Sequence, residues 1–203
     1  MHRIVVVAIG LLFAALSAGP AAAIDFSNPA FAPSGNRTTI PIGHYEFCKT
    51  SPADCAPRGA AVSAVMLTEK SWQALVDVNN WANEAFAPLS DMDQYQVEER
   101  WTYPVNAADC EDYVLAKRKA LLDAGWPAST LMIAVVQQYS GEGHAVLMVR
   151  TDRGDLVLDN QDGAIRVWNE TPYSYVKRQS QNDPAEWVAI TDDRAVVTAS
   201  TNR

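Results

Sequence analysis

The chain has 203 residues and carries 24 Asp and Glu residues against 16 Lys and Arg residues, so its formal net charge is −8. An acidic chain is repelled by nucleic-acid phosphates and by anionic lipids, and we expect neither as a partner. The length suits one domain with a sizeable core.

The first residues have the pattern of a secretory signal peptide. A basic start at Arg3 precedes an almost wholly apolar run, and 21–23 are three alanines before Ile24. The run is too short to cross a bilayer, and no other segment approaches the ~20 apolar residues of a membrane helix. We therefore expect a signal peptide over 1–23 and one mature domain over 24–203, periplasmic or secreted, without stable membrane insertion. Losing Arg3 would take the net charge from −8 to −9.

Three cysteines follow this segment. Cys48 and Cys55 flank a short turn-rich loop whose ends can meet, and their spacing favours a disulfide in an oxidising compartment. Cys110 is then left over, and a free thiol in an exported protein suggests reactivity. A different pairing, or three reduced cysteines, is the alternative.

The first half of the chain predicts helices. Residues 25–41 are rich in Pro, Ser, Asn and Gly, which indicates an extended lead-in. Thr68 is a good helix cap, and apolar residues at helical spacing predict a helix over 69–86. We interpret 91–106 as an irregular connection.

A second helix begins at a cysteine among carboxylates. Asp109 is placed to cap it, and apolar residues over 110–122 recur at amphipathic spacing. The Cys110 sulfur would lie near the positive end of the helix dipole, which favours the thiolate. Asp109, Glu111 and Asp112 oppose this effect by raising the pKa of the thiol, so a base, a cation or a metal must offset them.

The second half of the chain predicts strands separated by turns that contain Gly, Ser and Asp. Helices followed by an antiparallel sheet make an α+β fold, with N-terminal helices packed on the sheet. The strand candidates are 131–136, 144–149, 156–159, 164–168 and 186–190.

A histidine and an aspartate stand at matched strand ends. His144 opens one predicted strand and Asp159 ends the next, so an antiparallel hairpin makes them neighbours at one sheet edge. If the Cys110 helix packs against that edge, Cys110 attacks a carbonyl, His144 carries the proton and Asp159 orients the ring. His44 is the only other histidine beyond the signal, and we expect it on the surface.

Each of these residues also has a plain structural interpretation. Cys110 could simply pack at a helix start, His144 could be a surface residue at a strand end, and Asp159 could form a turn. The combination of all three is harder to explain in that way.

The motifs resemble the bacterial transglutaminase-like cysteine proteinases, a periplasmic branch of the papain and transglutaminase superfamily. The most specific pieces are D-C-E-D-Y over 109–113, G-H-A-V-L over 143–147 and V-L-D-N over 157–160. The resemblance runs from the Cys48 loop to at least Tyr175 and implies a papain/transglutaminase-like fold.

The same resemblance implies that Cys110, His144 and Asp159 are a catalytic triad. The best-understood relatives are calcium-dependent proteases that cut large surface adhesins, with acidic residues beside the cysteine binding Ca²⁺. This implies Asp109 and Glu111 as ligands, with Asp112 as a further candidate, and an adhesin-type protein substrate. A bound Ca²⁺ would neutralise the charge that opposes the thiolate.

Some questions stay open at this point. Asp109 cannot freely serve both as helix cap and as calcium ligand. The Cys110 amide is a natural oxyanion donor, with Trp101, Asn79 or Asn80 as weak candidates for a second. The same triad could serve a transglutaminase or an amidase, and the fold could also be a binding or regulatory module without turnover.

Overall fold

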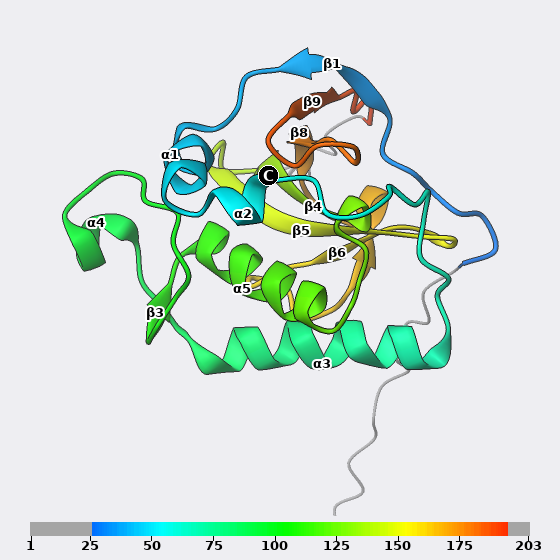
Figure 1. The fold of residues 1–203 in the computed structure, drawn as a ribbon, viewed down its shortest axis with the longest axis horizontal. Coiled ribbons are helices and arrows are strands. Elements are labelled where there is room, and N and C mark those ends of the chain that lie inside the picture. Colours follow the sequence, from blue (N-terminus) through cyan, green and yellow to red (C-terminus); the bar gives the residue numbers. More distant parts are fainter. Residues whose placement is uncertain (1–25, 195–203) are drawn as a thin grey trace, which may run out of the picture.

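The structure, a computed structural model, describes residues 26–194, and the expected signal peptide over 1–23 lies outside them. An antiparallel sheet of seven strands forms one layer, and helix α5 lies between this sheet and the longest helix, α3 (Figure 1). The predicted α+β class, with helices packed on an antiparallel sheet, is confirmed.

The strands of the main sheet follow the order β1-β9-β8-β4-β5-β6-β7, and all neighbours in it are antiparallel. The central strands β4, β5 and β6 are almost entirely buried, and helix α5 packs against β5. A separate pair, β2 and β3, is parallel. The bounds are Ser34–Thr38 (β1), Ala87–Pro88 (β2), Ala107–Ala108 (β3), Leu131–Gln137 (β4), Gly143–Thr151 (β5), Gly154–Leu158 (β6), Arg166–Val167 (β7), Ser174–Gln179 (β8) and Trp187–Ile190 (β9).

The helices lie mostly before the central strands in the chain. Their bounds are Ile42–Thr50 (α1), Pro52–Cys55 (α2), Glu69–Ala85 (α3), Asp91–Tyr95 (α4) and Cys110–Asp123 (α5), with 3₁₀ turns at Ala128–Thr130 and Trp168–Glu170. No helix among residues 26–194 is long and apolar enough to cross a membrane.

Helix α3 begins where the sequence predicts. Thr68 and Ser71 form a reciprocal capping box, in which each side chain bonds to the backbone of the other. Leu75, Asn79 and Ala82 recur on one face and are fully buried. This face packs on α5, so an asparagine enters the interior beside apolar side chains.

Helix α5 is more deeply buried than its sequence pattern indicates. It lies between the sheet and α3, so Lys117 and Arg118 are buried together with the apolar residues that the pattern assigns to the core. Arg118 donates to the carbonyl oxygen of Leu131 at 3.1 Å, which satisfies part of its guanidinium inside the protein.

The sequence pattern misses several elements. The segment 91–106 is not wholly irregular, since Ser90 caps the short helix α4 through the Asp93 amide. The lead-in contains β1, which pairs with β9. Strand β8 was also missed, because its charged residues obscure the period of two, although Arg178 and Gln179 are buried.

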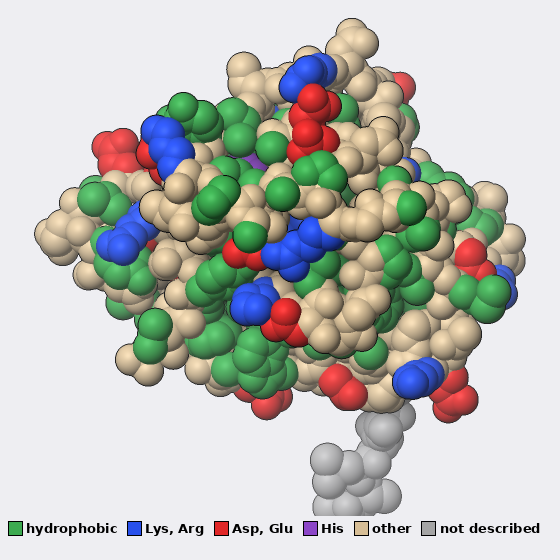
Figure 2. Space-filling model, in the orientation of Figure 1, with side chains coloured by type: hydrophobic (Ala, Val, Ile, Leu, Met, Phe, Trp, Pro, Cys, Tyr) green, Lys and Arg blue, Asp and Glu red, His purple; other side chains and the backbone are tan. Residues whose placement is uncertain are grey.

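On the face that Figure 2 shows, acidic and basic side chains of the described residues are interspersed. Lys and Arg side chains do not merge there into one large basic surface. This face therefore has no extended field of a single sign that would steer a polyanion.

Candidate active site

Helix α5 places Cys110 at its first position. Asp109 occupies the N-cap position with extended backbone angles, but its carboxylate makes no capping hydrogen bond. Cys110 is half-buried and is the free cysteine among residues 26–194. The thiol therefore stands at the positive end of the helix, in a residue that is only partly exposed.

The other two cysteines form the predicted disulfide. Cys48 and Cys55 are joined with an S–S distance of 2.01 Å, linking α1 to α2. His44 lies beside them, and its 1% exposure corrects the expectation of a surface residue. Because both sulfurs are used in the disulfide, this group offers no thiolate to a metal in the structure.

His144 and Asp159 are in direct contact. His144 is the second residue of β5, and Asp159 directly follows β6, which pairs with β5 up to Leu158. His144 Nε2 and Asp159 Oδ1 are 2.8 Å apart, and both side chains are buried. The hairpin therefore brings these two strand ends near one another, and the chain directly after β6 places Asp159 against His144.

Two further groups hold the Asp159 carboxylate. The Tyr173 hydroxyl donates to Oδ2, and the Gln161 amide donates to Oδ1 at 3.0 Å. Burial favours the neutral acid, but the bonds from His144, Gln161 and Tyr173 outweigh it and lower the pKa of Asp159. The carboxylate is thus kept ionised beside the imidazole.

The Cys110 thiol lies next to β5 but is engaged elsewhere. Its sulfur lies at the backbone amide of Ala145, the residue that follows His144, and its S–H donates to Glu111 Oε2 at 2.9 Å. The described residues show no hydrogen bond from this thiol to His144. Burial, and next the Glu111 carboxylate, raise the pKa of Cys110.

An acidic cluster surrounds the start of α5. One oxygen each from Asp91, Asp109 and Glu111 lies within 4.8 Å of the others. Burial raises the pKa of Asp109 to about 8 and of Glu111 to about 7, and neighbouring carboxylates add to both shifts. Oδ1 of Asp91 and Oδ1 of Asp109 are buried and lack a hydrogen-bond partner among the described residues.

Asp112 lies outside this group of three. Its Oδ1 accepts from the Thr102 amide at 2.7 Å, and burial raises its pKa to about 8. The sequence pattern missed Asp91, which is eighteen positions before Asp109 and arrives through α4. Its acidic side chain is the only feature of the sequence that suggests a role for Asp91 in this cluster.

The weak candidates for a second oxyanion donor have other places. Asn79 is fully buried and donates to the carbonyl oxygen of Gly163, whereas Asn80 is exposed. The Trp101 indole N–H donates to Glu99 at 2.5 Å. The role of the Cys110 backbone amide as an oxyanion donor is still a prediction.

A surface hollow of about 410 Å³ adjoins the His144–Asp159 pair. Gln161 and Tyr173 line this hollow and also contact the His144–Asp159 pair. Gln161 Nε2 lies 3.5 Å from His144 Nδ1, and the Tyr173 hydroxyl donates to Asp159 Oδ2. The lining residues are Gln138, Tyr139, Ser140, Gln161, Asp162, Pro172 and Tyr173.

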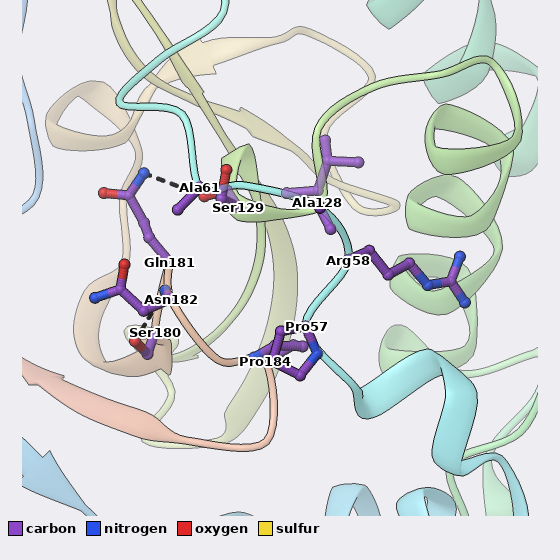
Figure 3. A pocket seen from close by; sticks show the side chains of 11 residues that line it. Pro57, Arg58, Ala61, Ala128, Ser129, Ser180, Gln181, Asn182 and Pro184 are labelled. Atoms are coloured by element: carbon purple, nitrogen blue, oxygen red, sulfur yellow. Dashed lines mark hydrogen bonds between the residues drawn. The ribbon is translucent and has the colours of Figure 1, made fainter.

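Figure 3 shows a different pocket, between the segment after α2 and the turn that follows β8. Gln181 donates across it to the Ser129 carbonyl oxygen at 3.1 Å. Its volume of about 20 Å³ suits a water molecule rather than a substrate. None of its lining residues belongs to the site around Cys110.

Sequence comparison decides the family. The profile of the bacterial transglutaminase-like cysteine proteinases matches residues 34–195. The chain belongs to this family. It is accordingly a cysteine peptidase of the transglutaminase-like type, as its motifs predict. A search of curated proteins finds no match.

Solved structures show the same fold. The chain is similar to Legionella pneumophila LapG in a calcium-bound form, with a TM-score of 0.51 and 23% identity over 62% of this chain and 71% of that one. An EGTA-treated form of the same protein gives a TM-score of 0.50 and 24% identity over 60% and 67%. At this identity the likeness concerns the fold.

Proposed function

We propose that this protein is a periplasmic or secreted cysteine peptidase in which Cys110, His144 and Asp159 form the catalytic triad. The observation that carries the proposal is the 2.8 Å contact between His144 Nε2 and Asp159 Oδ1, with Cys110 beside the next residue of β5. Family membership supports thiol peptidase chemistry. The signal-peptide pattern over 1–23 supports export.

The contact between Nε2 and Asp159 supports different roles for the two ring nitrogens of His144. Because Nε2 faces the Asp159 carboxylate, Nδ1 is the nitrogen that exchanges a proton with Cys110. In the first step Nδ1 takes the thiol proton, and the sulfur attacks the substrate carbonyl carbon. The imidazolium then gives this proton to the departing amine, which leaves an acyl thioester on Cys110.

Water completes the cycle through the same groups. Nδ1 accepts a proton from water, the hydroxide attacks the thioester carbonyl, and the proton returns to the sulfur as the acid departs. Asp159 stays ionised and fixes the ring orientation throughout. An amine in place of water would give acyl transfer, and the two reactions use the same residues.

We further propose that Asp91, Asp109 and Glu111 hold Ca²⁺. The residues fit this ion, since it prefers carboxylate oxygens and two buried oxygens of the cluster lack any other partner among the described residues. A bound Ca²⁺ would supply positive charge that offsets the three carboxylates. The calcium-bound form of LapG, a protein of similar fold, supports this assignment.

For the substrate we propose an exported protein of the surface-adhesin type, as the family motifs imply. The hollow beside His144 supports a polypeptide substrate, because it is open and lined by amide, hydroxyl and aromatic side chains. Such groups can bind an extended backbone through hydrogen bonds.

Labelling with iodoacetamide tests the triad. The mature protein, residues 24–203, is treated at neutral pH with calcium, and the modified residue is mapped by mass spectrometry. We expect rapid labelling of Cys110 that slows at least about tenfold in His144→Ala, because the thiolate loses its imidazolium. Equal rates in both proteins would contradict the proposal.

Cleavage tests the substrate class. Surface proteins from bacteria that lack this protein are incubated with the wild type or with Cys110→Ala, and new N-termini are identified. We expect new termini in a large exported adhesin only with the wild type. Termini that appear equally with Cys110→Ala, or none in any exported protein, would contradict the substrate assignment.

A further inference from the structure

The loop that carries Asp159 lies outside the sheet ladder. Strand β6 ends at Leu158, and the chain makes no further strand pairing until β7 begins at Arg166. Yet this loop must place two side chains accurately, since Asp159 bonds to His144 Nε2 and Gln161 lies 3.5 Å from Nδ1. Some other element has to fix its backbone.

Helix α3 supplies two hydrogen bonds to this loop. Asn83 Nδ2 donates to the carbonyl oxygen of Asp159 at 2.8 Å, and Asn79 Nδ2 donates to the carbonyl oxygen of Gly163 at 3.1 Å. The two asparagines are one helical turn apart and share a face. They therefore hold the loop at both of its ends.

These asparagines are costly for the helix. Asparagine is a poor residue for a helix interior, because its side chain competes for backbone hydrogen bonds. Asn79 is fully buried, and the Oδ1 atoms of both residues are buried without a hydrogen-bond partner among the described residues. A residue that served packing alone would be apolar here, so the two donors to the loop are what the asparagines add.

Helix α5 places a buried lysine beside the same loop. Burial lowers the pKa of Lys117 to about 7, and the Asp159 carboxylate opposes this shift because it attracts the ammonium form. Its Nζ has no hydrogen-bond partner among residues 26–194. The loop is thus held by hydrogen bonds from α3, and a buried lysine of α5 lies near its Asp159 carboxylate.

We propose that Asn83, assisted by Asn79, is a positioning residue that acts through the Asp159 backbone. It keeps the Asp159 carboxylate on His144 Nε2 and Gln161 beside Nδ1. This inference rests on the proposed triad, because it assigns the support of one triad member.

The test compares Asn83→Leu with Asn80→Leu. Leucine matches asparagine in shape and is the better helix former, so Asn83→Leu removes the donor without weakening the helix. Asn80 is exposed on the same helix and serves as the matched control. The first readout is the rate of Cys110 alkylation by iodoacetamide, and the second is the downfield NMR resonance of the imidazole N–H that His144 shares with Asp159.

In Asn83→Leu we expect alkylation to slow between about tenfold and a hundredfold, because a small misplacement of a supporting group has effects of this size. The imidazole resonance should shift or vanish, whereas the melting temperature and all properties of Asn80→Leu should stay near the wild type. If Asn83→Leu fails to fold, Asn83→Ala decides by the same two measurements.

Wild-type alkylation and an unchanged resonance in the Asn83 variant would overturn the inference. His144→Ala separates this failure from a failure of the triad. If Cys110 alkylation is slow in His144→Ala but has the wild-type rate in the Asn83 variant, only the positioning role of Asn83 is wrong. If alkylation in His144→Ala also has the wild-type rate, the proposed triad is wrong as well.

Discussion

The Tyr173 hydroxyl donates a hydrogen bond of 2.5 Å to Asp159 Oδ2, the carboxylate oxygen that His144 leaves free. The bond crosses from the segment before β8 to the end of β6, so it ties two loops together at the site. Burial and the Asp159 carboxylate raise the pKa of Tyr173, so the phenol stays protonated as a donor.

We expect Tyr173→Phe to raise the pKa of Asp159, because the carboxylate loses one of its donors. A less firmly held carboxylate orients His144 less well, so the rate of Cys110 alkylation should fall about tenfold. Tyr139→Phe is the control, since Tyr139 lines the same hollow and is 69% exposed. Equal rates for both variants would show that the Tyr173 hydroxyl is dispensable.

Calcium should stabilise the protein through Asp91. At a hundredfold excess over Kd, a ligand that binds only the folded state adds about 2.7 kcal/mol. This corresponds to a rise in Tm of roughly 5–10 °C for a domain of this size. Asp91→Asn should lose most of this rise in differential scanning fluorimetry.

The same substitution has an opposite effect in EGTA. Asn removes one charge from a cluster of buried carboxylates, so Asp91→Asn should melt above the wild type when calcium is absent. Asp93→Asn, an exposed change on the same helix, should retain the calcium response. A full response in Asp91→Asn would remove this residue from the proposed ligand set.

Calcium should also release the Cys110 thiol. In the structure the S–H donates to Glu111, and burial together with this carboxylate raises the thiol pKa. When Glu111 binds a cation instead, it opposes the thiolate less, so alkylation at pH 7.5 should accelerate at least about tenfold. Stopped-flow alkylation in calcium and in EGTA measures this effect. Identical rates would show that calcium does not influence the reactivity of the Cys110 thiol.

His44 should make the stability of the folded protein depend on pH. Its ring nitrogens face the Trp187 indole N–H at 3.2 Å and the Gln179 amide nitrogen at 3.1 Å. Burial, with Arg118 nearby, lowers the pKa of His44 from 6.5 to about 4. The unfolded chain therefore binds this proton more tightly, and the free energy of unfolding should fall by about 3 kcal/mol between pH 6.5 and pH 4.

Urea unfolding of the wild type and of His44→Gln across this range isolates the contribution. The other titrating groups are the same in both proteins, so their effects cancel in the difference. The variant should lose less stability on acidification than the wild type, whatever its stability at pH 7. Parallel pH profiles would exclude His44 as the titrating group.

Local patterns predict the parts of the site that local geometry builds. An antiparallel hairpin brings the ends of β5 and β6 near one another, and with them His144 and Asp159, and the start of α5 follows from the capping position of Asp109. The Cys48–Cys55 disulfide follows from a short loop. Each inference needs only neighbouring residues.

The remaining residues of the site and its surroundings could not be predicted, because tertiary packing brings them together from distant parts of the sequence. Asp91 joins the acidic cluster because α4 and its flanking chain fold back to the start of α5, which no periodicity in 91–106 indicates. His44 is a polar residue whose partners Trp187 and Gln179 come from the far end of the chain. Asn83 reaches Asp159 across 76 positions of sequence.

Strands β1 and β9 are the first and last strands of the described residues, and they pair with Ser34 opposite Ile190. A short linker across these two positions could join them covalently, since antiparallel partners lie only about 5 Å apart. New ends could then be opened in an exposed loop such as 59–62, to give a circular permutant whose active-site segments stay in their native order.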